Sequence, residues 1–393
     1  MKILKFDLLY PSAYFEQIKK RDQSIISSLS LQNYVQWIHE QQIGYGEVIS
    51  HAFKLAGWEV FDFYNQDPLY RQKLQAETGI RPSFFQLLSS VKRRYFYHVS
   101  LQDFIAAINR KEARKQILND VLVQEAIAYY KPDVIFLREP AQVNNRLFKE
   151  LKKKHLIVTL IGCNIAHPIN WNPLHSDLIF TIFKHYNTFF RINGIRSTMF
   201  EYGIAVQAYA QKAKNIDVSF VGLLGTNEQM QKTLLLESVA AKHPFQWWGP
   251  KGPLLDSFPH LTKTWQGVLA GKEMYEVYQR SKIVVNDYVD TANSDGVNMR
   301  IKEVMGTGSF LLTRFAENIR LLEEVNALKT FTTDTECSQL ISHYLLHEEE
   351  REQIAATGYT YACNQFGSST VMAPVITTIA EALEKKRTEI GLK

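Results

Sequence analysis

The strongest constraint on the fold is a regular alternation of helical and strand-like segments that starts twice along the chain. Short apolar runs at residues 133–137 and 156–160 are separated by a segment with helical periodicity, and a similar pattern begins again at Asp217. Alternation of this kind builds parallel sheets that helices cover on both faces. The sequence therefore predicts an α/β fold with two Rossmann-like units.

The expected elements follow from these patterns. Strands are expected at residues 2–9, 58–63, 133–137, 156–160, 177–183, 218–223, 245–248, 282–286, 309–313 and 328–332. Helices are expected at residues 44–55, 117–130, 143–153, 227–242, 272–280, 297–305, 317–325, 338–346, 348–364 and 369–385. A polar stretch with helical character fills residues 12–42.

A chain of 393 residues suits two domains better than one. The second start of the pattern places one domain at residues 1–205 and another at 206–368, with the hinge between Tyr202 and Lys214. Residues 369–393 hold a last helix and a tail. Five apolar residues share one face of this helix: Val371, Val375, Ile376, Ile379 and Leu383. The helix therefore needs a hydrophobic groove, which either domain could supply.

Composition bears on the compartment and on metal or disulfide chemistry. The chain has three cysteines, Cys163, Cys337 and Cys363, and none forms a Cys-x-x-Cys pair. This argues against a disulfide framework and against a structural zinc site. The first residues are too charged for a secretory signal, and the longest apolar run is shorter than the roughly 18 residues that a membrane span needs. We therefore expect a cytoplasmic protein.

Charge is distributed unevenly. Residues 1–205 contain 26 Lys and Arg against 18 Asp and Glu, whereas residues 206–393 contain 19 against 22. A basic first half suggests an anionic partner, although such a surplus is also ordinary over this length. Residues 92–97, Lys-Arg-Arg-Tyr-Phe-Tyr, could contact a membrane surface, an anionic acceptor or nucleic acid, or could be an ordinary amphipathic element. Nothing else indicates nucleic acid, so we expect no nucleic-acid partner.

The most informative segment, residues 294–308, follows an expected strand, opens an expected helix and closes with glycines. Asp295 and Glu303 are separated by seven residues. This spacing resembles that of the retaining glycosyltransferases of the GT-B fold, in which Glu-Gly-Phe-Gly is followed by four residues and a Glu. Here Asp295-Gly296-Val297-Asn298 is followed by four residues and Glu303, with Asp in place of the first Glu.

The surroundings resemble one branch of these enzymes, the CgeB-like spore-maturation glycosyltransferases. The resemblance covers residues 215–370, through the segments 218–226, 271–286 and 308–313. It implies two Rossmann-like domains that face each other across a cleft, with a C-terminal helix packing back across the domains. It also implies transfer of a sugar from a nucleotide-diphosphate sugar, bound by the second domain, to a hydroxyl acceptor with retention of configuration, in cell-surface glycan biosynthesis.

Helix geometry is compatible with these roles. The N–H groups and partial positive charge of a helix N-terminus favour a diphosphate at residues 296–298. Arg300 can reach a phosphate, and Glu303, about two turns along, can accept hydrogen bonds from a ribose diol. Asp295 can accept hydroxyls of the sugar. The alternative makes Asp295 an N-cap and Glu303 a solvated helix residue.

Further candidates for donor binding precede this segment. Gly222 and Gly225 follow a strand and would let a phosphate approach the backbone. Lys232 could balance a phosphate charge. Trp248 and Gly249 end a strand at the edge where open sheets bind ligands, and Trp248 could flank a nucleotide base. A surface lysine and a core tryptophan are the ordinary alternatives.

The first half offers a loop and two candidate catalytic residues. Gly44-Tyr45-Gly46-Glu47 could form a matching glycine loop, although it lacks a third glycine. His167 follows an expected strand end, and GT-B enzymes often place an N-domain histidine near the transferred sugar. Glu139 is a comparable candidate. A capping or core role is the alternative for the histidine.

No cluster in the sequence has metal-ligand spacing. Asp334-Thr335-Glu336 resembles the acidic metal motif of another transferase fold, but its position marks a helix start. We therefore expect no metal and no cofactor besides the nucleotide-sugar donor. The sequence does not determine whether the acceptor is a glycan, a lipid-linked glycan or a protein. Peripheral membrane contact through the basic N-terminal domain is also left undetermined. The alternatives to transfer are a nucleotide-sugar hydrolase or epimerase on the same fold and a non-catalytic spore or cell-surface assembly protein.

Overall fold

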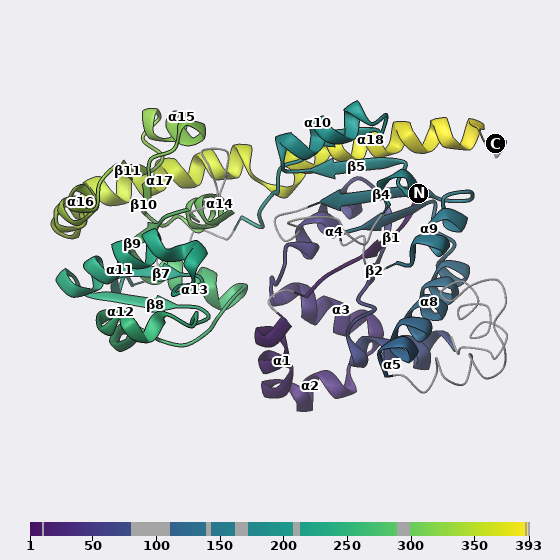
Figure 1. Ribbon diagram of the computed structural model, residues 1–393, viewed down its shortest axis with the longest axis horizontal. Coiled ribbons are helices and arrows are strands. Elements are labelled where there is room, and N and C mark those ends of the chain that lie inside the picture. The colour runs from purple at the N-terminus through teal and green to yellow at the C-terminus, as the bar shows by residue number, and fades with distance from the viewer. Residues whose placement is uncertain are drawn as a thin grey trace.

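The computed structural model describes residues 1–9, 12–79, 111–138, 143–161, 172–206, 213–288 and 299–389, together with residue 391. Within them the chain forms two parallel sheets, each packed with helices, which lie next to each other in Figure 1. The predicted α/β class with two Rossmann-like units is confirmed.

The N-terminal sheet has six parallel strands in the order β2-β1-β3-β4-β5-β6. Their bounds are β1 Lys2–Phe6, β2 Glu59–Phe63, β3 Val134–Leu137, β4 Leu156–Ile161, β5 Leu178–Thr181 and β6 Ser197–Met199. Both β3 and β4 are buried along their whole length, which explains their continuous apolar sequences. The sequence did not indicate β6, because three residues are too few to carry a periodic pattern.

The polar stretch at residues 12–42 forms three helices. The helices of this domain are α1 Ser12–Arg21, α2 Gln23–Ser28, α3 Leu31–Glu40, α4 Gly46–Leu55, α5 Pro68–Thr78, α8 Lys111–Tyr130, α9 Asn145–Leu151 and α10 Lys184–Ile192. Leu29 is extended after α2, and Ser30 Oγ then accepts a hydrogen bond from Asn33 N–H and caps α3. The stretch therefore folds over itself instead of extending as one long helix.

The C-terminal sheet has five parallel strands in the order β11-β10-β9-β7-β8. Their bounds are β7 Ile216–Val221, β8 Phe245–Trp248, β9 Ser281–Asn286, β10 Leu311–Arg314 and β11 Lys329–Phe331. The helices are α11 Met230–Lys242, α12 Pro259–Thr264, α13 Lys272–Arg280, α14 Met299–Gly306, α15 Arg320–Glu324, α16 Asp334–Leu346 and α17 Glu348–Gln365. Helix α16 begins four residues before the expected start, because Thr333 caps it by accepting a hydrogen bond from Glu336 N–H.

The last helix, α18 Ser368–Glu389, returns to the N-terminal domain and packs against α4 and β4 (Figure 1). Val375, Ile379 and Leu383 are buried there. The predicted helix that packs back across the domains is therefore confirmed, with its groove on the N-terminal side. Ile204 forms a β-bridge with Gly367, so the two connections between the domains lie next to each other.

Among the described residues, every helix is either too short or too polar to cross a lipid bilayer.

Candidate functional site

Two loops at the carboxyl edge of the C-terminal sheet pack against each other. Gly222 N–H donates to Trp248 O at 2.8 Å, and a Cβ atom on Gly249 would lie 2.0 Å from Gly222 O. Gly225 has a φ of 79°, and its N–H donates to Thr233 Oγ1 at 3.1 Å. A Cβ atom on Gly222 would lie 2.8 Å from Phe220 Cζ, so close packing and backbone conformation already require glycine at these positions. Their role in phosphate binding stays a prediction.

Helix α14 begins beside these loops and carries Arg300 in its first turn. Arg300 Nε donates to Tyr278 Oη at 3.1 Å, and the guanidinium lies 5.1 Å from the ring centre of Phe220 on β7. Burial would lower the pKa of Arg300, but Tyr278 and the charge of Glu303 outweigh it and raise that pKa. The side chain is therefore a fixed cation next to Gly222, where an added Cβ would come within 3.2 Å of it.

Lys232 also lies near the aromatic ring of Phe220. Its Nζ is 5.7 Å from the ring centre of Phe220, and the residue is buried in α11. The structure thus places Gly222, Lys232 and Arg300 around Phe220 at the end of β7. Their common role in donor binding stays a prediction. Trp248, by contrast, is half-buried against a core cluster of the same domain.

Glu303 lies one turn after Arg300 and is 4% exposed, so it is not a solvated helix residue. Burial raises the pKa of its carboxyl group, while the charge of Arg300 and a hydrogen bond from Tyr45 oppose that rise. A carboxylate that is kept from water and held beside a cation is suited to accept hydrogen bonds from a polar ligand.

The hydrogen bond to Glu303 comes from the N-terminal domain. Tyr45 immediately precedes α4, and its hydroxyl donates to Glu303 Oε1. Its φ of 62° is a left-handed conformation that tyrosine seldom adopts. The sequence pointed to the loop 44–47 but not to this contact. The one available signal was an aromatic residue between two glycines at a helix start.

Below this loop, charged side chains at the carboxyl edge of the N-terminal sheet form a buried cluster. Lys5 on β1 pairs with Asp7, lies 2.9 Å from Asp62 Oδ1 on β2 and donates to Gly46 O at 2.7 Å. Arg138, directly after β3, also pairs with Asp7. Burial would raise the pKa of Asp7, but Arg138 and Lys5 lower it. Through the hydrogen bond to Gly46 O, the cluster holds the first residue of α4 in place.

Glu47, in the first turn of α4, is a second carboxyl group close in sequence to Tyr45. Burial raises the pKa of Glu47. Burial also raises the pKa of Tyr275 on α13, and both Glu303 and Glu47 raise it further. The charges of carboxyl groups from the two domains therefore act on the same tyrosine.

A second contact joins the domains at the first helices. Arg21, at the end of α1, forms a 2.6 Å ion pair with Glu273 in α13. Lys272 N–H donates to Gln41 O at 3.0 Å. The segment 12–42 therefore contacts the C-terminal domain, and a separation of the two domains would have to break these contacts as well as that between Tyr45 and Glu303.

Six of the predicted site residues lie outside the described residues. They are Glu139, His167, Asp295, Gly296, Val297 and Asn298. The basic and aromatic segment 92–97 lies outside them too. Their roles stay predictions.

Among the described residues, no group of three or more His, Cys, Asp or Glu side chains is placed to hold a metal ion. Asp334 and Glu336 lie in the first turn of α16. Asp334 pairs with Arg314 at 3.1 Å, and Glu336 accepts a hydrogen bond from Thr332 N–H at 2.7 Å. These contacts fit a helix start.

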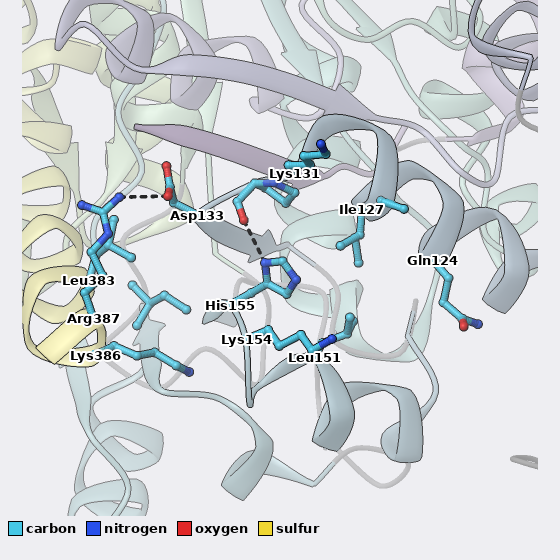
Figure 2. Close-up of a pocket in the computed structure, with 13 residues that line it drawn as sticks. Gln124, Ile127, Lys131, Asp133, Leu151, Lys154, His155, Leu383, Lys386 and Arg387 are labelled. Atoms are coloured by element: carbon cyan, nitrogen blue, oxygen red, sulfur yellow. Dashed lines mark hydrogen bonds and ion pairs between the residues drawn. The ribbon is translucent and has the colours of Figure 1, made fainter. Parts of the chain in front are cut away.

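A cavity of about 410 Å³ lies at the opposite, amino edge of the N-terminal sheet (Figure 2). It is lined by the ends of α8 and α9 and by the last turns of α18. Its cations Lys386 and Arg387 already pair with Asp177 at 2.5 Å and Asp133 at 2.9 Å, and helix C-termini attract cations without any ligand. Open parallel sheets bind ligands at the carboxyl edge. This cavity is therefore not the candidate site.

Comparison with known proteins bears on the family and on the fold. Residues 230–375, which include α14, match the family model described as glycosyl transferase-like. No curated protein matches the chain in sequence.

Several solved structures share the fold across almost the whole chain. A glycosyltransferase from Rickettsia africae is 12% identical, with 97% of this chain and 98% of that chain covered and a TM-score of 0.53. Sucrose-phosphate synthase from Thermosynechococcus elongatus is 10% identical (97% and 100% covered, TM-score 0.54). HepE from Anabaena, solved with UDP-glucose, is 13% identical (97% and 100% covered, TM-score 0.55). At these identities the likeness shows the fold, and the predicted GT-B architecture is confirmed.

Proposed function

We propose that this protein is a retaining glycosyltransferase, which binds a nucleotide-diphosphate sugar in its C-terminal domain and transfers the sugar to a hydroxyl acceptor on the N-terminal side. The observation that carries the proposal is the position of Arg300 and Glu303 on α14, where a cation and a buried carboxyl group meet at the carboxyl edge of the sheet. The match to the glycosyl transferase-like family model supports it.

Arg300 is the residue that we assign to the diphosphate. Cleavage of the sugar–phosphate bond leaves negative charge on the departing diphosphate, and a cation already fixed by Tyr278 and Phe220 stabilises that charge without reorganisation. Lys232 adds positive charge on the same side. Residues 296–298, which precede α14 in the sequence, are the predicted source of backbone N–H groups for the diphosphate, and Gly222 and Gly225 remain candidates for the loop around the phosphates.

Glu303 is the residue that we assign to the ribose diol of the donor. Tyr45 donates to one of its oxygens, so the ribose has to share the carboxylate with Tyr45 or displace it. Trp248 and Gly249 are the candidates next to the base. Asp295 would contact the sugar, and His167 and Glu139 are the candidate catalytic residues of the N-terminal domain.

The biological setting that we propose is cytoplasmic synthesis of a cell-surface glycan, as in the CgeB-like branch that residues 215–370 resemble. The acceptor would be a hydroxyl group of a glycan, a lipid-linked glycan or a protein.

The proposal is tested first by ligand binding and then by turnover. Melting curves recorded with a panel of nucleoside diphosphates and their sugars should show one nucleotide that raises the melting temperature, because a ligand of the native state stabilises it. Release of the nucleoside diphosphate from the matching sugar should then depend on an added acceptor. Release without an acceptor would instead indicate a hydrolase, interconversion of the sugar an epimerase, and no binding at all a non-catalytic protein.

Turnover should not require a metal ion. Arg300, Lys232 and the helix start provide the positive charge that a divalent cation supplies in metal-dependent transferases. Activity should therefore survive treatment with EDTA and dialysis. Loss of turnover with EDTA, followed by recovery with manganese or magnesium, would contradict the prediction.

Donor binding should strengthen as the pH rises through the pKa of Glu303. Burial holds that pKa above the ordinary glutamate value of about 4.3, and the ionised carboxylate is the better hydrogen-bond acceptor. The hydrogen bond from Tyr45 lowers the same pKa, so Tyr45→Phe should move the midpoint of the binding profile to higher pH.

Calorimetric titration at a series of pH values measures both midpoints. The intact nucleotide sugar is the ligand of choice, because a terminal phosphate itself titrates near pH 6, at about the value known for phosphate monoesters. A midpoint for Tyr45→Phe at or below that of the wild type would count against the assignment of Glu303.

A further inference from the structure

The outer side of α10 and of the edge strand β6 exposes three apolar side chains. Phe189, Ile192 and Met199 are 54%, 79% and 45% exposed. Phe189 and Ile192 are three residues apart and share one face of α10. Phe190, between them in sequence, is buried and anchors the helix to the core. Helix α10, which packs on β5 and β6, lies along the upper edge of the N-terminal domain in Figure 1.

The same surface carries positive charge. Lys184, Arg191 and Arg196 are exposed, and no Asp or Glu occurs between Asp177 and Glu201. Among the described residues, none of these three cations forms an ion pair. We refer to Lys184, Phe189, Arg191, Ile192, Arg196 and Met199 as the α10 patch.

Another exposed apolar residue of this protein has a different setting. Leu346, at the end of α16, is 82% exposed, but Glu348, Glu349 and Glu350 follow it. A single exposed apolar residue needs no explanation, whereas a group of them among unpaired cations indicates an interaction surface.

From this combination we infer that the α10 patch docks the protein onto a lipid bilayer with anionic headgroups. Phenylalanine and aliphatic side chains insert at the boundary between headgroups and acyl chains, and Lys and Arg remain at the level of the headgroups, which attract them. The patch has both components on one short helix and its following strand.

Other macromolecules fit the patch less well. A stable protein interface buries roughly 800 Å² on each partner, and three protruding side chains provide only part of such an area. Single-stranded nucleic acid stacks successive bases on several aromatic rings, whereas Phe189 is the one aromatic residue of the α10 patch.

Docking through the α10 patch would hold the N-terminal domain against a membrane. This domain is the one to which we assign the acceptor, so a lipid-linked acceptor would be presented on the correct side. The inference does not depend on the proposed reaction, because lipid binding is measured without turnover.

The test is sedimentation of the full chain with vesicles of two compositions. Vesicles of equal parts phosphatidylglycerol and phosphatidylcholine should carry the protein into the pellet, and vesicles of phosphatidylcholine alone should not. Added salt should weaken the binding, because it screens charges beyond about 10 Å at 0.1 M.

Three variants locate the contact. Phe189→Ser with Ile192→Ser should lower the partition coefficient by at least about tenfold, because it removes the inserting side chains. Lys184→Gln with Arg191→Gln and Arg196→Gln should lower it by about a hundredfold. Leu346→Ser, a matched loss of an exposed apolar residue, should bind as the wild type does. Melting curves establish that each variant is folded.

Three outcomes would overturn the inference. The first is a wild type that fails to bind the anionic vesicles, and the second is unchanged binding by both α10 patch variants. The third is a wild-type dimer in sedimentation velocity that the Phe189→Ser and Ile192→Ser variant disrupts, which would assign the patch to a second copy of the chain.

Discussion

Replacement of Lys5 by methionine is expected to lower the free energy of unfolding by about 3–5 kcal/mol, the usual cost when a buried ion pair loses one partner. Lys5 is 0% exposed and contacts Asp7, Asp62 and the carbonyl group of Gly46. Without Lys5, the negative charges of Asp7 and Asp62 are balanced only in part by the remaining cations around them. For a domain of about 150–250 residues, the melting temperature should fall by about 6–20 °C.

Lys282→Met is the matched control. Lys282 also pairs with an aspartate, Asp217 at 2.6 Å, but the two side chains are 34% and 36% exposed. Its loss should cost no more than about 1 kcal/mol. Calorimetric melting of the three proteins measures the difference. Equal stabilities of Lys5→Met and Lys282→Met would contradict the account of the buried cluster.

The effect of Lys5→Met should also depend on pH. In the wild type, Lys5 lowers the pKa of Asp7 and of Asp62, so both stay ionised in acid. Burial raises both pKa values, and in the variant Lys5 no longer opposes it, so the carboxyl groups take up protons at a higher pH than in the wild type. The difference in stability should therefore shrink as the pH falls into the acid range.

Replacement of Arg300 by methionine is expected to lower kcat/KM by about a hundred- to a thousandfold, the range found when one preorganised donor to a developing negative charge is removed. Arg300→Lys should also lose activity, because lysine cannot keep both the hydrogen bond of Nε to Tyr278 and the contact of the guanidinium with the Phe220 ring. Steady-state kinetics with the nucleotide sugar found in the ligand panel measures both effects.

Arg320→Met is the control for this series. Arg320 is an exposed arginine of the same domain, and it pairs with Glu317 at 2.7 Å. Its loss should leave kcat/KM unchanged. Wild-type kcat/KM in Arg300→Met, with a normal melting curve for each protein, would remove Arg300 from the proposed mechanism.

The sequence predicted the two sheets well, because their central strands are buried on both faces. β3 and β4 are continuous apolar runs, and such runs between helical segments are a direct sign of a parallel sheet. The short edge strand β6 and the breaks within residues 12–42 were not predicted. A strand of three residues carries no pattern, and the capping of α3 by Ser30 is a local polar contact.

The candidate site was predicted in part. The spacing of Asp295 and Glu303 pointed to α14, because both residues belong to one local segment. The contact between Tyr45 and Glu303 could not be predicted, since it joins residues 258 positions apart across two domains. The cluster of Lys5, Asp7, Asp62 and Arg138 is also non-local, although a lysine within an apolar strand was a signal that it would need partners.

The glycines after β7 show that one residue type can have two different structural causes. Sequence reasoning assigned Gly222 and Gly225 to a phosphate loop, because glycine lets a ligand approach the backbone. In the structure a Cβ atom on Gly222 would lie 2.8 Å from Phe220 Cζ, and one on Gly225 would lie 2.8 Å from Leu255 N. Close packing requires the same residue type, and a sequence cannot distinguish the two reasons.

The central claim, that α14 holds the nucleotide of the donor, is tested most directly by titrating Glu303→Gln with the nucleoside diphosphate. Glutamine keeps the size and helix propensity of glutamate, but it weakens a charge-assisted acceptor that is worth about 1.5–3 kcal/mol. The account predicts about 10- to 150-fold weaker binding, while Glu349→Gln, an exposed glutamate of the same domain, binds as the wild type does. If Glu303→Gln is folded and binds the nucleotide as tightly as the wild type, Glu303 does not contact the donor and the central claim is wrong.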